Sequence, residues 1–429
     1  MTTVAVAEKA ESTELHGFFT RSRKVGLLLV VVGLAVTAGL GFGVLGSSSK
    51  AEFKLDMTAP NAADINLPAQ GMVIGLGVVA VITGVVLFLS INPRLFAWLT
   101  GLSVTTTVLA LLVWAVSVAH TELPVESALS LSIVAALPLI YGSLAGVVCE
   151  RSGVINVGIE GQLLAGAFTG AFVGTTTHSP WIGMIAAALS GAVVTFLLAA
   201  LAIRFLMDQV VLGVLLNLLV LGITGVVFDT LMQPHASSFN DPAAAPRWTI
   251  PGLADIPVIG PAIFRQNVFV YAAIVLVVAV WLLLFKTRWG LRTRSVGEHP
   301  AAADSVGIKV NVLRFRNVVL AGLISGFGGA LFTIGSDLGF SKNMTVGKGF
   351  IALAVLIVGR WNPLGALAGA LLFGFADYMQ GFLSSVEGGF PVPSEFIKML
   401  PYVVTIIAVA GLIGRVRAPA ADGKPYIKS

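Results

Sequence analysis

Long apolar runs, separated by short polar breaks, extend along most of the chain. Most of them are near the ~20 residues that a helix needs to cross the hydrocarbon core of a bilayer. The run at 349–359 is short for a full crossing, and a partial helix is permitted where protein covers its ends. The pattern predicts about 10–12 membrane-spanning helices, at residues 25–46, 71–91, 95–119, 126–148, 154–177, 181–203, 209–232, 268–285, 317–336, 349–359, 363–384 and 396–414.

The distribution of Lys and Arg predicts how these runs are oriented. Basic residues are enriched in cytoplasmic loops, so we place the N-terminal tail, the basic segment 286–316 and the C-terminal tail inside. An even number of crossings, with both termini in the cytoplasm, satisfies all three placements. Of the 26 Lys and Arg, seven then lie outside: Lys50, Lys54, Arg247, Arg265, Lys342, Lys348 and Lys398.

Composition supports the same class of protein. Hydrophobic residues make up 56% of the 429 residues and charged residues 11%, with a mean hydropathy of +0.94. Globular chains average about 25% charged residues, so we predict an all-α polytopic membrane protein. The formal charge of +5 is spread over the ends of apolar runs and predicts no nucleic-acid partner. The single cysteine, Cys149, excludes an intramolecular disulfide.

The polar segment 286–316 holds the first candidate site. Pro300 suits the first position of a helix, where its missing N–H costs nothing, and Gly307 can end that helix in the left-handed conformation. We therefore expect a two-turn helix on a cytoplasmic loop, available to a cytosolic partner. The alternative is an ordinary solvated loop. Seven basic residues surround this helix: Lys286, Arg288, Arg292, Arg294, Lys309, Arg314 and Arg316.

An interrupted apolar stretch, residues 137–168, holds the second candidate site. Asn156 and Glu160 enter what should be hydrocarbon, at a helical spacing of four residues that places them on one face. Buried ionisable groups in a membrane are costly, which makes them candidates for a solute path. Asn217, in the middle of the run at 209–232, is a further candidate. Alternatively, these side chains hydrogen-bond the backbone of a broken helix and never contact substrate.

Three motifs resemble one family. GLRTRSVGEHPAAADSVGIKV resembles the cytoplasmic coupling loop of importer permeases that carry branched-chain amino acids, simple sugars or nucleosides. ERSGVINVGIEGQLLAGA resembles their nucleoside-type branch, and GRWNPLGALAGALLFG is a third match. The resemblance implies a permease fold similar to that of the vitamin B12-type permeases. It also implies ATPase coupling through Gly297, Glu298, Pro300, Ala302, Asp304 and Gly307.

The resemblance also implies how the chain is organised. A cytoplasmic tail (1–24) precedes N-terminal transmembrane helices (25–125), a permease core (126–414) that contains the coupling loop, and a second cytoplasmic tail (415–429). His299 departs from the family pattern, because many relatives have Asn there, and Asn is the better helix cap.

The implied function is that of the permease subunit of an ATP-driven importer in a bacterial plasma membrane, with a nucleoside as solute. The implied partners are cytosolic ATPase subunits, a second permease chain in a homo- or heterodimer, and an extracytoplasmic solute-binding lipoprotein. No G-x-x-x-x-G-K-[ST] motif occurs, so ATP and Mg²⁺ would bind to the ATPase subunits, and we expect no catalytic, cofactor or metal site on this chain.

Other solutes and another class of transporter stay open at this point. A ribose-like sugar or a branched-chain amino acid are the alternative solutes. An ion-coupled secondary transporter that binds its ion at Glu160 is the alternative mechanism.

Overall fold

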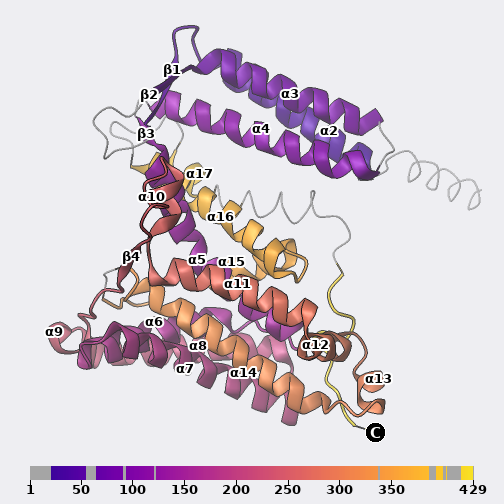
Figure 1. Cartoon of the computed structure of the whole chain (residues 1–429), viewed down its shortest axis with the longest axis vertical. Coiled ribbons are helices and arrows are strands. Elements are labelled where there is room, and N and C mark those ends of the chain that lie inside the picture. The colour runs from indigo at the N-terminus through magenta and orange to yellow at the C-terminus, as the bar shows by residue number, and fades with distance from the viewer. Residues whose placement is uncertain are drawn as a thin grey trace, which may run out of the picture. The chain divides into compact units, whose positions relative to one another are not determined.

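The computed structural model describes residues 21–54, 64–89, 93–119, 122–336, 339–385, 393–399, 402 and 417–428. The chain forms two compact units (Figure 1). The first comprises residues 1–128 and 379–414, and the second comprises residues 129–378 and 415–429. Helices dominate both units, which confirms the all-α prediction.

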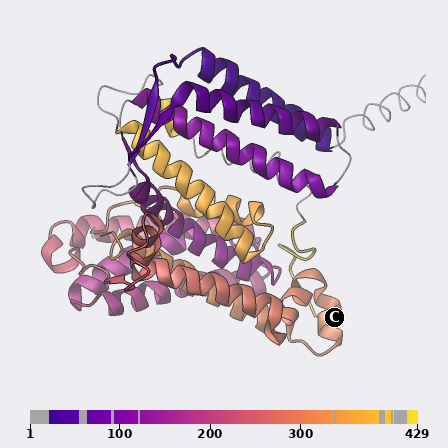
Figure 2. The ribbon, with the colours of Figure 1, turned by 45° about the horizontal axis from the view of Figure 1, so that its top comes forward.

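Three long helices lie side by side in the first unit (Figure 2). A small sheet accompanies them, in which β1 pairs with β2 antiparallel and with β3 parallel. Val25, Leu29 and Leu87 form a buried cluster between the first two long helices. The elements are α2 (Arg21–Leu34) with its π-helical continuation η1 (Ala35–Phe42), β1 (Lys50–Lys54), β2 (Asp64–Pro68), α3 (Ala69–Leu89), α4 (Pro93–Ala119), β3 (Leu123–Pro124) and α17 (Ser394–Lys398).

The second unit contains most of the remaining helices. Its long helices are α5 (Val125–Glu150), α6 (Ile159–Thr176), α7 (Pro180–Ala199), α8 (Gln209–Val227), α11 (Val268–Lys286), α14 (Val310–Gly329) and α16 (Pro363–Ser384). Shorter elements are η2 (Ala200–Arg204), η3 (Phe228–Met232), α9 (Ala236–Phe239), β4 (Arg247–Thr249), α10 (Ile259–Phe264), β5 (Arg265–Asn267), α12 (Arg288–Glu298), α13 (Pro300–Ser305), η4 (Ala330–Phe332) and α15 (Lys348–Val358).

Glycines allow α6, α7 and α14 to pack closely. A Cβ placed on Gly326 of α14 would collide with the backbone of Gly191 in α7, and one on Gly166 of α6 would collide with Gly326. Small residues at such positions let helix backbones approach each other in a membrane, where van der Waals packing replaces the hydrophobic effect between helices. Gly166, Gly191 and Gly326 therefore serve helix packing within this chain.

Nine helices in the described part of the chain are long and apolar enough to span a membrane. Every predicted run up to 363–384 corresponds to a helix, which confirms a polytopic membrane protein. Two helices differ from a simple span. α6 is less apolar and mostly buried, because α7, α8 and α14 pack around it, and α15 has only 11 residues. Most of the run at 396–414 lies outside the described residues.

Candidate functional site

The basic segment between α11 and α14 contains two helices, where the sequence predicted one. α13 begins at Pro300 and is followed by Gly307 at φ +85°, as expected. The additional helix α12 is capped by Thr287, whose hydroxyl oxygen accepts a hydrogen bond from the Gly290 N–H at 3.2 Å. The residues before Gly297 were predicted to be loop, so this capping signal at Thr287 was not recognised in the sequence. His299 makes no capping hydrogen bond through its side chain.

One face of this helix pair is buried and the other is exposed. Val296, Ala303 and Val310 form a small core that fixes α13 against α12 and the start of α14. Gly297 is buried where a Cβ would collide with the carbonyl of Arg151. On the other face, Ala302 is exposed and Val306 has 76% of its surface exposed. α13 therefore presents small, apolar residues on a rigidly held support.

Residues 417–428, which we call the C-terminal strap, lie against this helix pair (Figure 1). The Ala421 N–H donates to the Gly297 carbonyl at 2.8 Å, and the Ala420 N–H donates to Oε2 of Glu298 at 3.2 Å. Near its end, Lys428 pairs with Asp304 at 3.7 Å. The strap thus contacts three of the residues that the sequence assigned to ATPase coupling.

Arg314 connects the strap to the turn between α5 and α6. This side chain is only 2% exposed, and its guanidinium donates to the carbonyls of Ser152 (3.0 Å), Lys424 (2.8 Å) and Ala421 (3.5 Å). Gly153 makes room for it, since a Cβ there would lie 2.6 Å from Nη2 of Arg314. The sequence placed Arg314 among the seven basic residues around the predicted cytoplasmic helix. It is buried because α14 begins at Val310, several residues before the apolar run.

A carboxyl group of the strap, that of Asp422, meets the carboxyl group of Glu150. Asp422 hydrogen-bonds Glu150, the last residue of α5, and such a bond between two carboxyls requires one proton. Burial raises the pKa of Asp422 from 3.8 to about 7, against the opposing effects of a backbone hydrogen bond from Gly423, of the hydrogen bond with Glu150 and of the Arg314 charge. The bound strap therefore favours a carboxyl pair that keeps its shared proton near neutral pH.

This pKa predicts that the strap binds less tightly as the pH rises. A raised carboxyl pKa gives stability that is complete below 3.8 and is lost as the pH rises through about 7. We expect amide hydrogen exchange of the strap to be slower at pH 6 than at pH 8 after correction for the intrinsic exchange rate. Asp422→Asn should reduce this difference, and Asp255→Asn, in an exposed loop, should not. An unchanged difference in Asp422→Asn would contradict the assignment.

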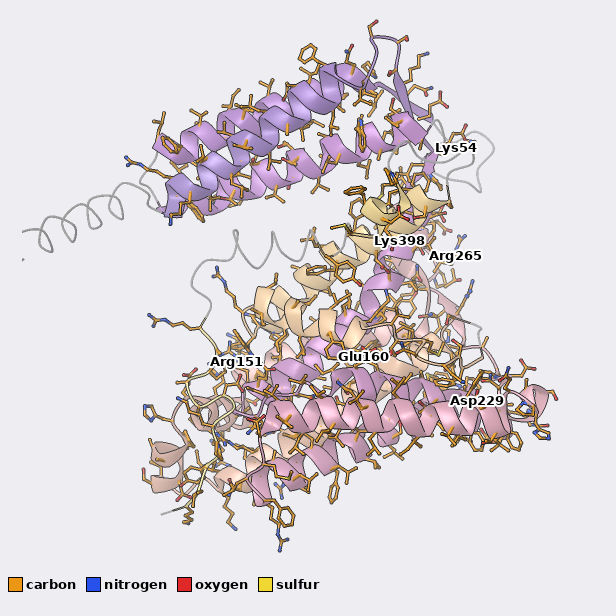
Figure 3. The ribbon with its side chains drawn as sticks, turned by 180° about the vertical axis from the view of Figure 1, so that it is seen from behind. Lys54, Arg151, Glu160, Asp229, Arg265 and Lys398 are labelled. Atoms are coloured by element: carbon orange, nitrogen blue, oxygen red, sulfur yellow. The ribbon has the colours of Figure 1, made fainter. Side chains whose placement is uncertain are left out.

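Glu150 and Arg151 contact the turn before α16 and not each other. Oε2 of Glu150 accepts from the indole N–H of Trp361 at 2.6 Å. Arg151 donates to the carbonyls of Trp361 (2.8 Å) and Arg360 (3.3 Å), and burial lowers its pKa. The motif at 359–374 is thereby joined to the α5–α6 turn. Figure 3 shows Arg151 and Asp229 near opposite ends of the second unit, with Glu160 between them.

The chain between α5 and α6 is non-helical from Arg151 to Gly158. Asn156 therefore precedes α6. The prediction that it shares a helix face with Glu160 is wrong. Its amide is fully buried and exchanges two hydrogen bonds with Gln162, at 2.7 and 3.2 Å. The hydroxyl of Ser325 on α14 donates to Oε1 of Gln162 at 2.7 Å. This neutral network joins the broken segment to α14.

Glu160 closes the N-terminus of α15. Its Oε1 accepts from the Thr345 hydroxyl at 2.5 Å and the Gly347 N–H at 2.8 Å, and Oε2 accepts from the Gly349 N–H at 2.6 Å. Glu160 as a whole residue is 8% exposed. Free N–H groups and the helix dipole favour a negative charge at such a position. Glu160 thus bonds two backbone donors next to a partial helix.

Asn217 plays a similar part at the start of α6. Its Oδ1 accepts from the Gly161 N–H at 2.8 Å, and its Nδ2 donates to the Val157 carbonyl at 3.0 Å. The side chains of the three predicted path residues, Asn156, Glu160 and Asn217, are all hydrogen-bonded to other residues of the chain. This geometry favours the bracing alternative, and their contact with a solute stays a prediction.

Several residues of this arrangement were not predicted from the sequence. Thr345 and Gly349 lie almost 190 positions from Glu160, and Asp422 lies in what looked like a polar tail. The Asp422–Gly423 pair was a local turn signal, and Gly423 has φ +70°. The residues that contact this turn come from distant parts of the chain, and they leave no such local pattern in the sequence.

The site and fold define a polytopic membrane protein. Its helix pair α12–α13 is fixed by the C-terminal strap, and hydrogen bonds stabilise the interruption between α5 and α6 in its core. Comparison with known proteins gives the family. Residues 128–409 match the model described as "Branched-chain amino acid transport system / permease component". This chain belongs to that family and is a permease component of a transport system.

Individual relatives match most of the chain. It is 43% identical over 307 residues to the guanosine ABC transporter permease protein NupQ of Bacillus subtilis, covering 69% of this chain and 95% of the relative. It is 39% identical over 299 residues to the nucleoside ABC transporter permease protein NupC of Lactococcus lactis, covering 68% and 94%. A glucose ABC transporter permease protein of Haloferax volcanii is 26% identical over 290 residues, covering 65% and 74%. No solved structure matches.

Proposed function

We propose that this chain is the membrane-spanning permease subunit of an ATP-driven nucleoside importer. The observation that carries the proposal is the pairing of an exposed two-turn helix, α13, with relatives named for guanosine and nucleoside transport at 43% and 39% identity. A rigid helix that offers small residues to a partner suits a contact through which motion is transmitted.

The coupling runs through contacts described above. Cytosolic ATPase subunits bind α13 at Ala302 and Val306, and ATP-driven closure moves the α12–α13 pair. Gly297 and the C-terminal strap pass that movement to Arg314 and the α5–α6 turn. From there, Glu150 and Arg151 reach the turn before α16. The neutral network of Asn156 and the bracing by Glu160 keep the broken helix intact during the change.

The partners and orientation complete the proposal. ATP and Mg²⁺ bind to the ATPase subunits. A second permease chain and an extracytoplasmic solute-binding lipoprotein complete the complex in a bacterial plasma membrane, with both termini in the cytoplasm. The strap supports a cytoplasmic C-terminus, because it lies on the helix pair that would meet the ATPase.

Uptake of labelled guanosine and adenosine in cells with and without this chain tests the solute class. We expect uptake to be lost on deletion, restored by the wild-type chain, and reduced by excess uridine but not by excess ribose or leucine. Unchanged nucleoside uptake on deletion would contradict the solute assignment. The similarity to a glucose permease makes a simple sugar the second candidate, and in that case labelled ribose or glucose uptake would be lost instead.

A further inference from the structure

A groove lies between α7 and α14, at the N-terminal end of α14. It has a volume of about 510 Å³, within the range of ligand sites. Phe196, Ala200 and Ile203 line one side, and Val312 and Phe315 line the other. We call it the α7–α14 groove. The rings of Phe196 and Phe315, which both line the groove, meet edge to face at 5.4 Å between centroids.

Two arginines stand at this groove. Arg204 ends η2 and Arg316 lies on α14, and both side chains line the groove and are exposed. In the described part of the chain, neither guanidinium has an ion pair or a hydrogen-bond acceptor. Arg316 also lines an adjoining hollow of about 480 Å³, together with Arg292 and Lys309. The groove is therefore apolar inside and positively charged at its mouth.

The two arginines lie at the depth of the boundary between acyl chains and headgroups. Arg204 is the last residue of an apolar span that starts at Pro180. Directly after it, Phe205, Leu206 and Met207 expose 65%, 42% and 46% of their surfaces. Exposed apolar residues next to an arginine indicate the boundary between acyl chains and headgroups, where a long basic side chain reaches the polar layer.

We infer that the α7–α14 groove binds one anionic phospholipid, with an acyl chain along Phe196 and Phe315 and its phosphate between Arg204 and Arg316. Charge complementarity selects this occupant, because basic pockets between transmembrane helices suit anionic headgroups. Arg is also suited to bidentate hydrogen bonds with phosphate oxygens. The inference depends on the membrane spans and not on the transported solute. It places a lipid against Val312, two residues after α14 begins.

Native mass spectrometry of the purified transporter complex tests this site. The complex is titrated with phosphatidylglycerol or with phosphatidylcholine of the same acyl chains. We expect one tightly retained phosphatidylglycerol and no equivalent phosphatidylcholine. Arg316→Gln and Arg204→Gln should each weaken retention about fivefold, from the ~1 kcal/mol expected for a basic residue at an anionic surface. Arg288→Gln is the matched control, an exposed arginine outside both hollows, and should retain the lipid like wild type.

Val312→Trp separates a lipid from a free phosphate. The indole fills the apolar groove and keeps both arginines, so phosphatidylglycerol retention should fall, whereas a phosphate-only site would be unaffected. Added glycerol phosphate should not displace the lipid at equal concentration, because it lacks acyl chains. Equal retention of the two lipids by wild type, or wild-type retention by Val312→Trp or by the double Arg→Gln variant, would overturn the inference.

Discussion

Replacing Glu160 with alanine is expected to destabilise the protein strongly and to abolish uptake. The change removes the acceptor for the N–H groups of Gly347 and Gly349 and for the Thr345 hydroxyl. Leaving buried donors unsatisfied costs about 1–3 kcal/mol each, so a loss of about 3 kcal/mol is the expected order. Thermal unfolding of the purified chain in detergent measures the effect.

Glu160→Gln separates bracing from contact with solute. Glutamine keeps one oxygen acceptor, so the unfolding temperature should fall between those of wild type and Glu160→Ala. The order of preference among solutes should stay that of wild type. Asp229→Asn is the matched control, since this exposed acid pairs with Lys342 at the other end of the unit, and it should unfold like wild type. Wild-type stability in Glu160→Ala, together with an altered solute preference, would assign Glu160 to the path.

The second large effect is expected at Arg314. Arg314→Met keeps the length of the buried chain but leaves the carbonyls of Ser152, Lys424 and Ala421 without their shared donor. Hydrogen bonds to a charged donor contribute about 1.5–3 kcal/mol each, so the strap should detach. The strap hydrogen-bonds Gly297 and Glu298, so its detachment should weaken coupling to the ATPase. Uptake should fall about tenfold or more, which corresponds to a loss of ~1.4 kcal/mol of coupling free energy.

Removal of residues 418–429 checks that the effect runs through the strap. This truncation should reduce uptake to the level of Arg314→Met while the chain still inserts in the membrane. Arg265→Met, at an exposed arginine of β5 outside both hollows, should retain uptake and the strap's protection from hydrogen exchange. Normal uptake by the truncated chain would show that the strap is not needed for coupling.

Sequence patterns predicted the membrane helices and the ends of α13 because their causes are local. A bilayer demands about 20 apolar residues from every span, and Pro300 and Gly307 suit one helix position each. The interruption near Gly153 and Gly158 was predictable for the same reason, since glycine disfavours a helix wherever it stands.

The partners of the buried polar residues were not predictable in this way. In the sequence, Glu160 is an ionisable residue within an apolar run. The structure shows that the backbone N–H groups of Gly347 and Gly349 donate hydrogen bonds to it. Arg314 reads as one more cytoplasmic cation, and only the start of α14 at Val310 and the returning C-terminus bury it. Such contacts join segments more than 100 residues apart, and a single sequence carries no record of them.

The most direct test of coupling through α13 is a cross-link from Ala302→Cys. The natural cysteine, Cys149, is fully buried, so the new thiol on α13 is the accessible one in the described part of the chain. With a heterobifunctional thiol–amine reagent in native membranes, we expect a product of this chain and the ATPase subunit whose yield changes when ATP is added. Ser238→Cys on α9, at the opposite end of the unit, should give no such product (Figure 1). An ATPase cross-link from Ser238→Cys and none from Ala302→Cys would contradict the account.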